Sequence, residues 1–178
     1  MNYRIVKIYT EALYEAAAEQ KKTELVFSDM KSIREVFANS AEFRQFCANP
    51  SIGLPARISI LQKIFTGKVD KLTENFLQIL AKKNRLNFIQ EICQQFEELY
   101  KEKHNIALIK IMSSTELATT QISSIAHHLK LKLRKEIESV FRLDPLLMGG
   151  FKVAMGDVIY DSTIKSQLEK LRKNLYLN

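Results

Sequence analysis

The side chains that most often catalyse reactions or bind metals are few in this chain, and their spacing matches no catalytic or metal-binding pattern. His127 and His128 are adjacent in a stretch with helical periodicity, so their side chains point about 100° apart, which disfavours joint metal binding, and His104 lies far from both in sequence. Cys47 and Cys93 each sit within apolar helical patterns, which favours buried free thiols over a disulfide or redox pair. We therefore predict no metal and no cofactor.

The glycines and serines give no stronger indication of catalysis. Gly149, Gly150 and Gly156 do not form a dinucleotide fingerprint, because the pattern after them predicts a strand and not a helix. The chain has no phosphate-loop Gly-Lys-Ser/Thr sequence, and no serine lies in a nucleophile elbow. A hydrolase whose catalytic groups meet only in space remains an alternative, and we predict a protein that is not an enzyme.

The same glycines instead predict a tightly turned structure between residues 144 and 175. Gly149 and Gly150 can adopt positive φ angles that cost other residues roughly 1–2 kcal/mol, so they favour a sharp turn into the alternating strand FKVAM. Gly156 then suits a hairpin turn before the apolar run VIY. Asp161 or Ser162 is expected to cap a final helix, and its apolar stripe consists of Ile164, Leu168, Leu171 and Leu175.

The order of these features resembles the C-terminal signature of the delta subunit family of F-type ATP synthases, whose mitochondrial members are the oligomycin-sensitivity-conferring proteins. The segments YTEALYEAAA, at residues 9–18, and NFLQILAKKNRL, at residues 75–86, are similar to the first and fifth helices of that family. The resemblance covers the whole chain and depends on order and length, since none of these motifs is catalytic.

The residue pattern predicts a mainly α-helical protein of two domains. Residues 1–104 show six short helical patterns, which indicate a six-helix antiparallel bundle. Residues 105–178 alternate between strand and helix patterns, which predicts a small α+β domain with a short sheet and two helices. In the first helix we expect Ile5, Ile8, Ala12 and Ala16 to face the core, and in the fifth Leu72, Phe76 and Leu80.

Three apolar residues lie off these predicted core stripes: Tyr9, Leu13 and Ile79. They are either absorbed by wide core faces or form a groove for a partner helix. The family resemblance implies the groove, since helices one and five of the family receive the N-terminal helix of an alpha subunit of the catalytic head.

The resemblance also implies that the C-terminal domain binds the b subunits of the peripheral stalk. Leu171 and Leu175 are candidate contacts, although the stripe that they belong to would also be suited to cover the small sheet. The implied function is a stator: a single-copy, monomeric tether between catalytic head and stalk, so that rotation is coupled to ATP synthesis. It implies a peripheral position on the cytoplasmic face of a bacterial plasma membrane without direct insertion.

The charge of the chain leaves one alternative function open. The formal net charge is +7, and the one dense basic cluster consists of Lys130, Lys132, Arg134 and Lys135. Such a cluster is typical of a solvated face, but it also permits a basic RNA-associated module. No RNA-binding signature or interleaved aromatic residues accompany it, so we expect no nucleic acid partner.

Overall fold

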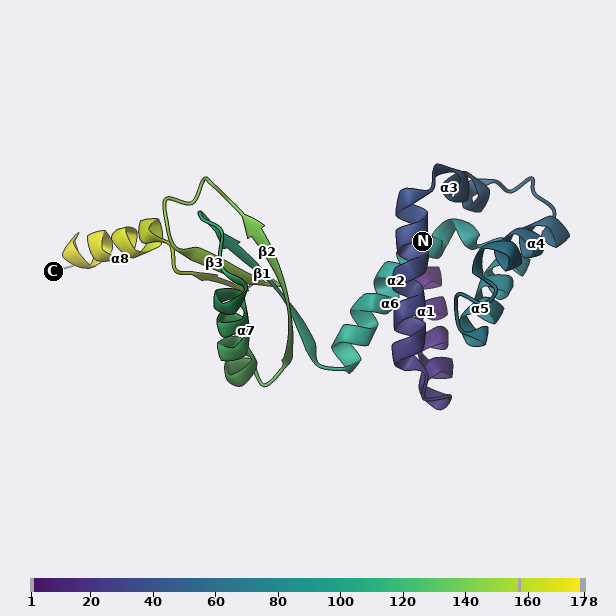
Figure 1. Ribbon diagram of the computed structural model, residues 1–178, viewed down its shortest axis with the longest axis horizontal. Coiled ribbons are helices and arrows are strands. Elements are labelled where there is room, and N and C mark those ends of the chain that lie inside the picture. Colours follow the sequence, from purple (N-terminus) through teal and green to yellow (C-terminus); the bar gives the residue numbers. More distant parts are fainter. Residues whose placement is uncertain (1, 157, 177–178) are drawn as a thin grey trace. The chain divides into compact units, whose positions relative to one another are not determined.

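The chain divides into two compact units in a computed structural model, which describes residues 2–156 and 158–176, apart from the side chains of residues 2, 170, 171 and 173–176. The first unit spans Met1–Lys101 and the second Glu102–Asn178. Helices dominate the described residues, and the strands all belong to one small four-stranded sheet in the second unit (Figure 1). Each unit is described by itself.

The first unit consists of helices joined by short loops (Figure 1). In chain order they are α1 (Asn2–Glu19), α2 (Thr23–Asn39), α3 (Ala41–Ala48), α4 (Leu54–Phe65), α5 (Lys71–Lys82), the short 3-10 helix η1 (Leu86–Phe88) and α6 (Ile89–Lys103). Helix α2 contacts α1, α3 and α5, and α4 packs on α5. The core of this unit is built mainly from α2, α5 and α6, which supply most of its fully buried side chains.

Local side chains explain where several of these helices begin and end. The Ser40 side chain accepts a hydrogen bond from the Phe43 amide at the start of α3, and Asp70 accepts one from the Leu72 amide at the start of α5. These bonds satisfy amides that have no partner within the helix. Past the helix ends, Gly67 and Asn84 adopt positive φ angles of 75° and 56°, which are conformations that glycine and asparagine tolerate best.

The buried side of α1 differs from the predicted one. The helix buries Val6, Thr10, Leu13 and Ala17, whereas Ile8 is 55% exposed. The predicted stripe, which began at Ile5 and Ile8, is wrong by a rotation of about one residue around the helix axis. In α5 the buried residues are Thr73, Phe76, Leu77, Leu80 and Ala81, so the predicted Phe76 and Leu80 are confirmed.

A polar network fixes the start of α5 against α2. The Asp29 carboxylate accepts hydrogen bonds from the Thr73 hydroxyl at 2.7 Å and from the Asp70 amide at 2.8 Å. The Lys22 ammonium donates to the Asp70 carboxylate at 2.8 Å. The hydrogen bond from Lys22, followed by that from the Leu72 amide, lowers the pKa of Asp70.

We expect Asp70→Asn to destabilise the first unit at neutral pH and to have less effect in acid. A carboxyl whose pKa is lower in the folded chain contributes stability above its unfolded pKa of 3.8, and this contribution is lost as the pH falls through the folded pKa. The loss should be on the order of 1 kcal/mol at pH 7, because asparagine keeps the capping oxygen but not the charge.

Urea unfolding of the variant and the wild type between neutral pH and about pH 3 measures this difference. The matched control is Glu35→Gln, which removes the same charge from an exposed site on α2. A difference in free energy of unfolding that stays constant with pH would show that the Asp70 charge contributes nothing.

The second unit is a mixed sheet with one helix packed on it. Its elements are β1 (Ile106–Ser113), α7 (Thr119–Leu133), β2 (Glu136–Leu143), β3 (Phe151–Met155), β4 (Val158–Asp161) and α8 (Ile164–Tyr176). The strand order is β2-β1-β3-β4, with β1 and β2 parallel and the other pairs antiparallel. Helix α7 connects the two parallel strands, as a crossover must.

One face of this sheet is buried and the other is partly open. Ile109, Ile111 and Val153 form the buried centre, and α7 packs over them with Ile122, Ile125 and Leu129. Side chains alternate between faces along a strand, so the opposite face presents the cross-strand row Val140, Lys110, Ala154 and Ile159. Val140 and Ile159 on this open face are 49% and 61% exposed.

Candidate partner-binding surfaces

The first candidate surface lies where α1 meets α5. The rings of Tyr9 and Phe76 meet edge to face with centroids 6.2 Å apart, and Arg85 follows the end of α5 and donates a hydrogen bond to the Tyr9 hydroxyl at 3.2 Å. Ile79 lies about one turn beyond Phe76 on α5 and is 47% exposed. We call the surface formed by Tyr9, Phe76, Ile79 and Arg85 the Tyr9–Ile79 face.

The predicted partner contacts divide between this face and the core. Tyr9 is half-buried and Ile79 is exposed, so both are placed where an incoming helix could touch them. Leu13 is 3% exposed and belongs to the buried side of α1, so the expectation that it lies off the core is wrong. Its physical role in this chain is to pack α1 against the other helices. Arg85 was missed by sequence reasoning, because an isolated arginine after a helix carries no distinctive signal.

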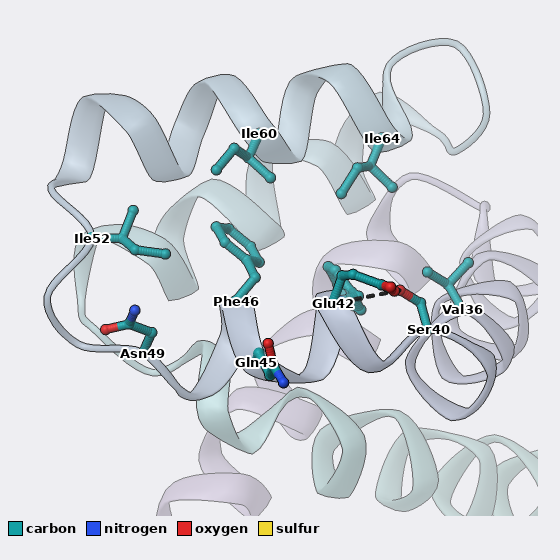
Figure 2. Close-up of a pocket in the computed structure, with 10 residues that line it drawn as sticks. Val36, Ser40, Glu42, Gln45, Phe46, Asn49, Ile52, Ile60 and Ile64 are labelled. Carbon is teal, nitrogen blue, oxygen red and sulfur yellow. Dashed lines mark hydrogen bonds between the residues drawn. The ribbon is translucent and has the colours of Figure 1, made fainter.

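The first unit also has a pocket that the sequence analysis did not predict. A pocket of about 550 Å³ opens between α3, α4 and the loop that joins them. Figure 2 shows Ile60 and Ile64 of α4 directed toward Phe46 of α3, with Ile52 closing one end. Glu42 is at the other end and accepts a hydrogen bond from the Ser40 hydroxyl. The walls are mainly apolar, and the lining residues include no histidine, cysteine or lysine.

The glycine turn of the second unit depends on a close approach of two backbone segments. Gly149 and Gly150 have φ angles of 137° and 81°, and the Ser162 amide donates to the Phe151 carbonyl at 3.0 Å just beyond them. A Cβ atom on Gly150 would lie 2.5 Å from the Ser162 carbonyl oxygen. The turn therefore requires a residue without a side chain at position 150.

The start of α8 is held by a residue that the sequence analysis did not choose. The Thr163 hydroxyl accepts a hydrogen bond from the Ser166 amide at 3.3 Å, so Thr163 is the residue that caps the helix. Asp161 lies two residues before Thr163, and its carboxylate accepts hydrogen bonds from both the amide and the hydroxyl of Thr163. The prediction that Asp161 or Ser162 caps α8 is therefore wrong. These bonds from Thr163 lower the pKa of Asp161, and the ion pair with Lys152 at 3.3 Å adds to the effect.

Helix α8 leaves the sheet and does not lie across it (Figure 1). Ile164 and Leu168 are 50% and 60% exposed, so the described part of its apolar stripe does not cover the sheet. The side chains of Leu171 and Leu175, which we predicted as stalk contacts, lie outside the described residues. The second candidate surface thus consists of the open face of the sheet together with Ile164 and Leu168.

The basic cluster on α7 is partly engaged within the second unit. Lys130 forms an ion pair with Glu136 at 2.7 Å, and the Lys132 ammonium lies 5.1 Å from the centre of the Tyr160 ring. The paired residues that the structure places on the open face of the sheet are aliphatic and charged, with no aromatic ring among them on which a base could stack. Both observations weaken the alternative of an RNA-associated module.

Thiol groups are not exposed, and metal-binding groups are not clustered, in the part of the chain that the structure describes. Cys47 and Cys93 are buried free thiols, as predicted, and burial raises the pKa of Cys47 to about 12, so its reactive thiolate is scarce at neutral pH. Within residues 2–156 and 158–176 no group of histidine, cysteine and acidic side chains is arranged to hold a metal ion. In the same part of the chain, no helix has the length and apolarity to cross a membrane.

Comparison with known proteins gives a consistent match along the whole chain. The family model for the ATP synthase delta (OSCP) subunit matches residues 5–175. The ATP synthase subunit delta of Prochlorococcus marinus strain MIT 9301 is 33% identical over 94% of this chain and 93% of the relative. The subunit delta of Chlorobaculum tepidum is 34% identical over 94% of this chain and 92% of the relative.

A solved structure supports the same fold. A chain in the cryo-EM structure of the Toxoplasma gondii mitochondrial ATP synthase hexamer aligns with a TM-score of 0.72 at 20% identity, covering 96% of this chain and 97% of that one. Because this identity is low, the match concerns the fold alone. The two relatives share about a third of their residues with this chain over nearly its full length. Together with the family model, they establish that this chain belongs to the ATP synthase delta (OSCP) subunit family.

Proposed function

We propose that this chain is the peripheral-stalk subunit that joins the catalytic head of a proton-translocating F-type ATP synthase to its membrane-anchored stalk. The observation that carries the proposal is the family match over residues 5–175. The chain is a non-catalytic subunit of that enzyme, as its membership of the delta (OSCP) family indicates.

The Tyr9–Ile79 face is the proposed contact with the catalytic head. It combines an exposed aliphatic side chain, Ile79, with the half-buried ring of Tyr9, which packs on the buried Phe76 ring, and aliphatic and aromatic groups are what an amphipathic helix buries when it docks on two neighbouring helices. The proposed occupant is the N-terminal helix of an alpha subunit. The Leu13 side chain supports this face from inside the core and does not itself contact the partner.

The open face of the second unit is the proposed contact with the b subunits. Val140, Ile159, Ile164 and Leu168 are exposed by about half or more, and a soluble protein rarely leaves such a set uncovered without a partner. The charged side chains on this face of the sheet are of both signs, since Lys110 and Arg142 share it with Glu136 and Glu138, so the exposed aliphatic groups carry the proposed contact. Leu171 and Leu175 on α8 remain proposed contacts.

The mechanism is mechanical. The rotating shaft would turn the whole head unless a static connection resisted the torque, so the tether must survive many catalytic cycles. Such persistence favours nanomolar or tighter binding, about −12 kcal/mol, with slow dissociation. Two separate units suit this task, since each can be specialised for one partner. We further propose one copy per complex, at the cytoplasmic face of a bacterial membrane.

A reconstitution experiment tests this function. Purified catalytic head and purified b subunits should each bind the wild-type chain, and should form a three-part complex only when the chain is present. Size-exclusion chromatography with light scattering would measure both the composition and the copy number. Failure of the chain to bind the catalytic head from its own organism would contradict the proposal.

A further inference from the structure

The Tyr9–Ile79 face contains a cation that has no anionic partner within the described residues. Arg85 is half-buried, and its guanidinium carbon lies 5.3 Å from the centre of the Tyr9 ring. Its one side-chain hydrogen bond goes to the neutral Tyr9 hydroxyl. Among the described residues no carboxylate lies within ion-pair distance of it.

Three other cations of the first unit are neutralised or fully enclosed. Lys22 pairs with Asp70 and Arg34 with Glu97. Arg57 has no carboxylate, but it is 6% exposed and donates inside the fold to the Asn84 side chain and the Asn49 carbonyl. Arg85 differs from all of these because it combines a free charge with access from outside.

The geometry of Arg85 leaves most of its hydrogen-bonding capacity unused. A guanidinium carries five N–H donors, and one of them is satisfied by Tyr9. The cation–π contact and the hydrogen bond with Tyr9 restrain the group, so less side-chain freedom remains to be lost when a partner binds. A guanidinium held in this way matches the two oxygens of a carboxylate.

We infer that Arg85 is a specificity-determining residue of the Tyr9–Ile79 face, and that the helix which binds there carries an aspartate or glutamate beside its apolar stripe. The inference rests on the proposed contact with the catalytic head and adds the chemistry by which that contact is selected. Ile79 and the Tyr9 ring supply apolar area, and Arg85 fixes the register and direction of the incoming helix.

The test uses a synthetic peptide with the first residues of the alpha subunit from the same organism, titrated against the full chain by calorimetry. At low salt, Arg85→Gln should weaken binding about tenfold, and the loss should shrink when the ionic strength is raised to about 0.3 M. Arg85→Lys should keep part of the affinity, because it keeps the charge but not the fork geometry. Arg85→Glu should regain binding to a peptide in which the acidic residue is replaced by lysine.

Two control variants test whether the position of the lost charge matters. Lys83→Gln removes an exposed positive charge from the same end of α5 and should change binding less than about twofold. Lys63→Gln removes an exposed positive charge from α4, a helix that contributes no residue to the face, and should also bind nearly as well as the wild type. Thermal unfolding of each variant confirms that the first unit is intact.

The possible failures have different meanings. If the wild type binds the peptide and Arg85→Gln binds equally well, or is weakened equally at both salt concentrations, the role of Arg85 is overturned and the proposed function stands. If the wild type does not bind the peptide, the proposed contact with the alpha subunit is itself wrong, and the role of Arg85 is overturned with it.

Discussion

Gly150→Val is expected to unfold the second unit, residues 102–178, and to leave the first unit folded. Gly150 has a φ of 81°, where a β-branched residue is strained by roughly 1–2 kcal/mol or more. The new Cβ would also lie 2.5 Å from the Ser162 carbonyl oxygen and 2.9 Å from the Thr163 Cα. Both neighbours are backbone atoms of the link between β4 and α8, so relief of the clash requires a shift of that link.

The total cost should reach several kcal/mol, which is comparable with the whole stability of a small domain. Hydrogen exchange measured along the chain should show loss of protection in β1, β3 and β4, with protection in α2 and α5 preserved. The matched control is Gly156→Ala, since Gly156 also has a positive φ, 55°, but a Cβ there meets nothing within 4 Å. That variant should lose only about 1 kcal/mol. Protection in Gly150→Val equal to the wild type would refute the account of this turn.

The strands and most helices could be predicted from sequence because their signals are local. The alternation in FKVAM predicted a strand at residues 151–155, and β3 has those bounds. The positive φ angles of Gly67 and Asn84, just past the ends of α4 and α5, likewise depend on the residue types themselves. At each of these positions, the residue and its neighbours in sequence are sufficient to determine the backbone conformation.

The buried side of α1 could not be predicted in this way. Ile5, Ile8, Ala12 and Ala16 have helical spacing, and so do Val6, Thr10, Leu13 and Ala17. The run of alanines gives almost no contrast between the two sides, and the buried side contains a threonine. The choice between the two sides depends on which neighbouring helices α1 meets, and that is decided by the tertiary structure.

The partner surfaces were predictable only in part, for a related reason. Ile79 could be identified as an apolar residue off the core stripe of α5, and it is exposed. Arg85 gains its significance from Tyr9, which is 76 positions away in sequence. The Thr163 cap was missed because three consecutive residues, Asp161, Ser162 and Thr163, all have side chains that can cap a helix. Only the hydrogen bonds distinguish them.

Ile79→Asp is expected to weaken binding to the catalytic head by about 100-fold or more without unfolding the chain. Docking of an apolar helix on the Tyr9–Ile79 face would replace the apolar contact of isoleucine by a charge. The new carboxylate would also compete for Arg85 with the acidic residue proposed for the incoming helix, and the two effects together cost several kcal/mol. Folding should be affected by less than about 1 kcal/mol, because Ile79 is 47% exposed and the substitution costs only helix propensity and an unfavourable charge near the end of α5.

The control for this prediction is Ile8→Asp, which introduces the same charge at a residue of the same type that is 55% exposed. Ile8 lies on the side of α1 opposite to Val6, Thr10 and Leu13, so its substitution should leave binding to the head unchanged. Sedimentation of the chain with the purified catalytic head measures the affinity, and urea unfolding measures the stability. Normal affinity in Ile79→Asp would show that the Tyr9–Ile79 face is not part of the interface. Equal losses of affinity in both variants would show that the added negative charge weakens binding regardless of its position on the first unit. A loss confined to Ile79→Asp would locate the contact on α5, because the two variants differ only in where the carboxylate is placed.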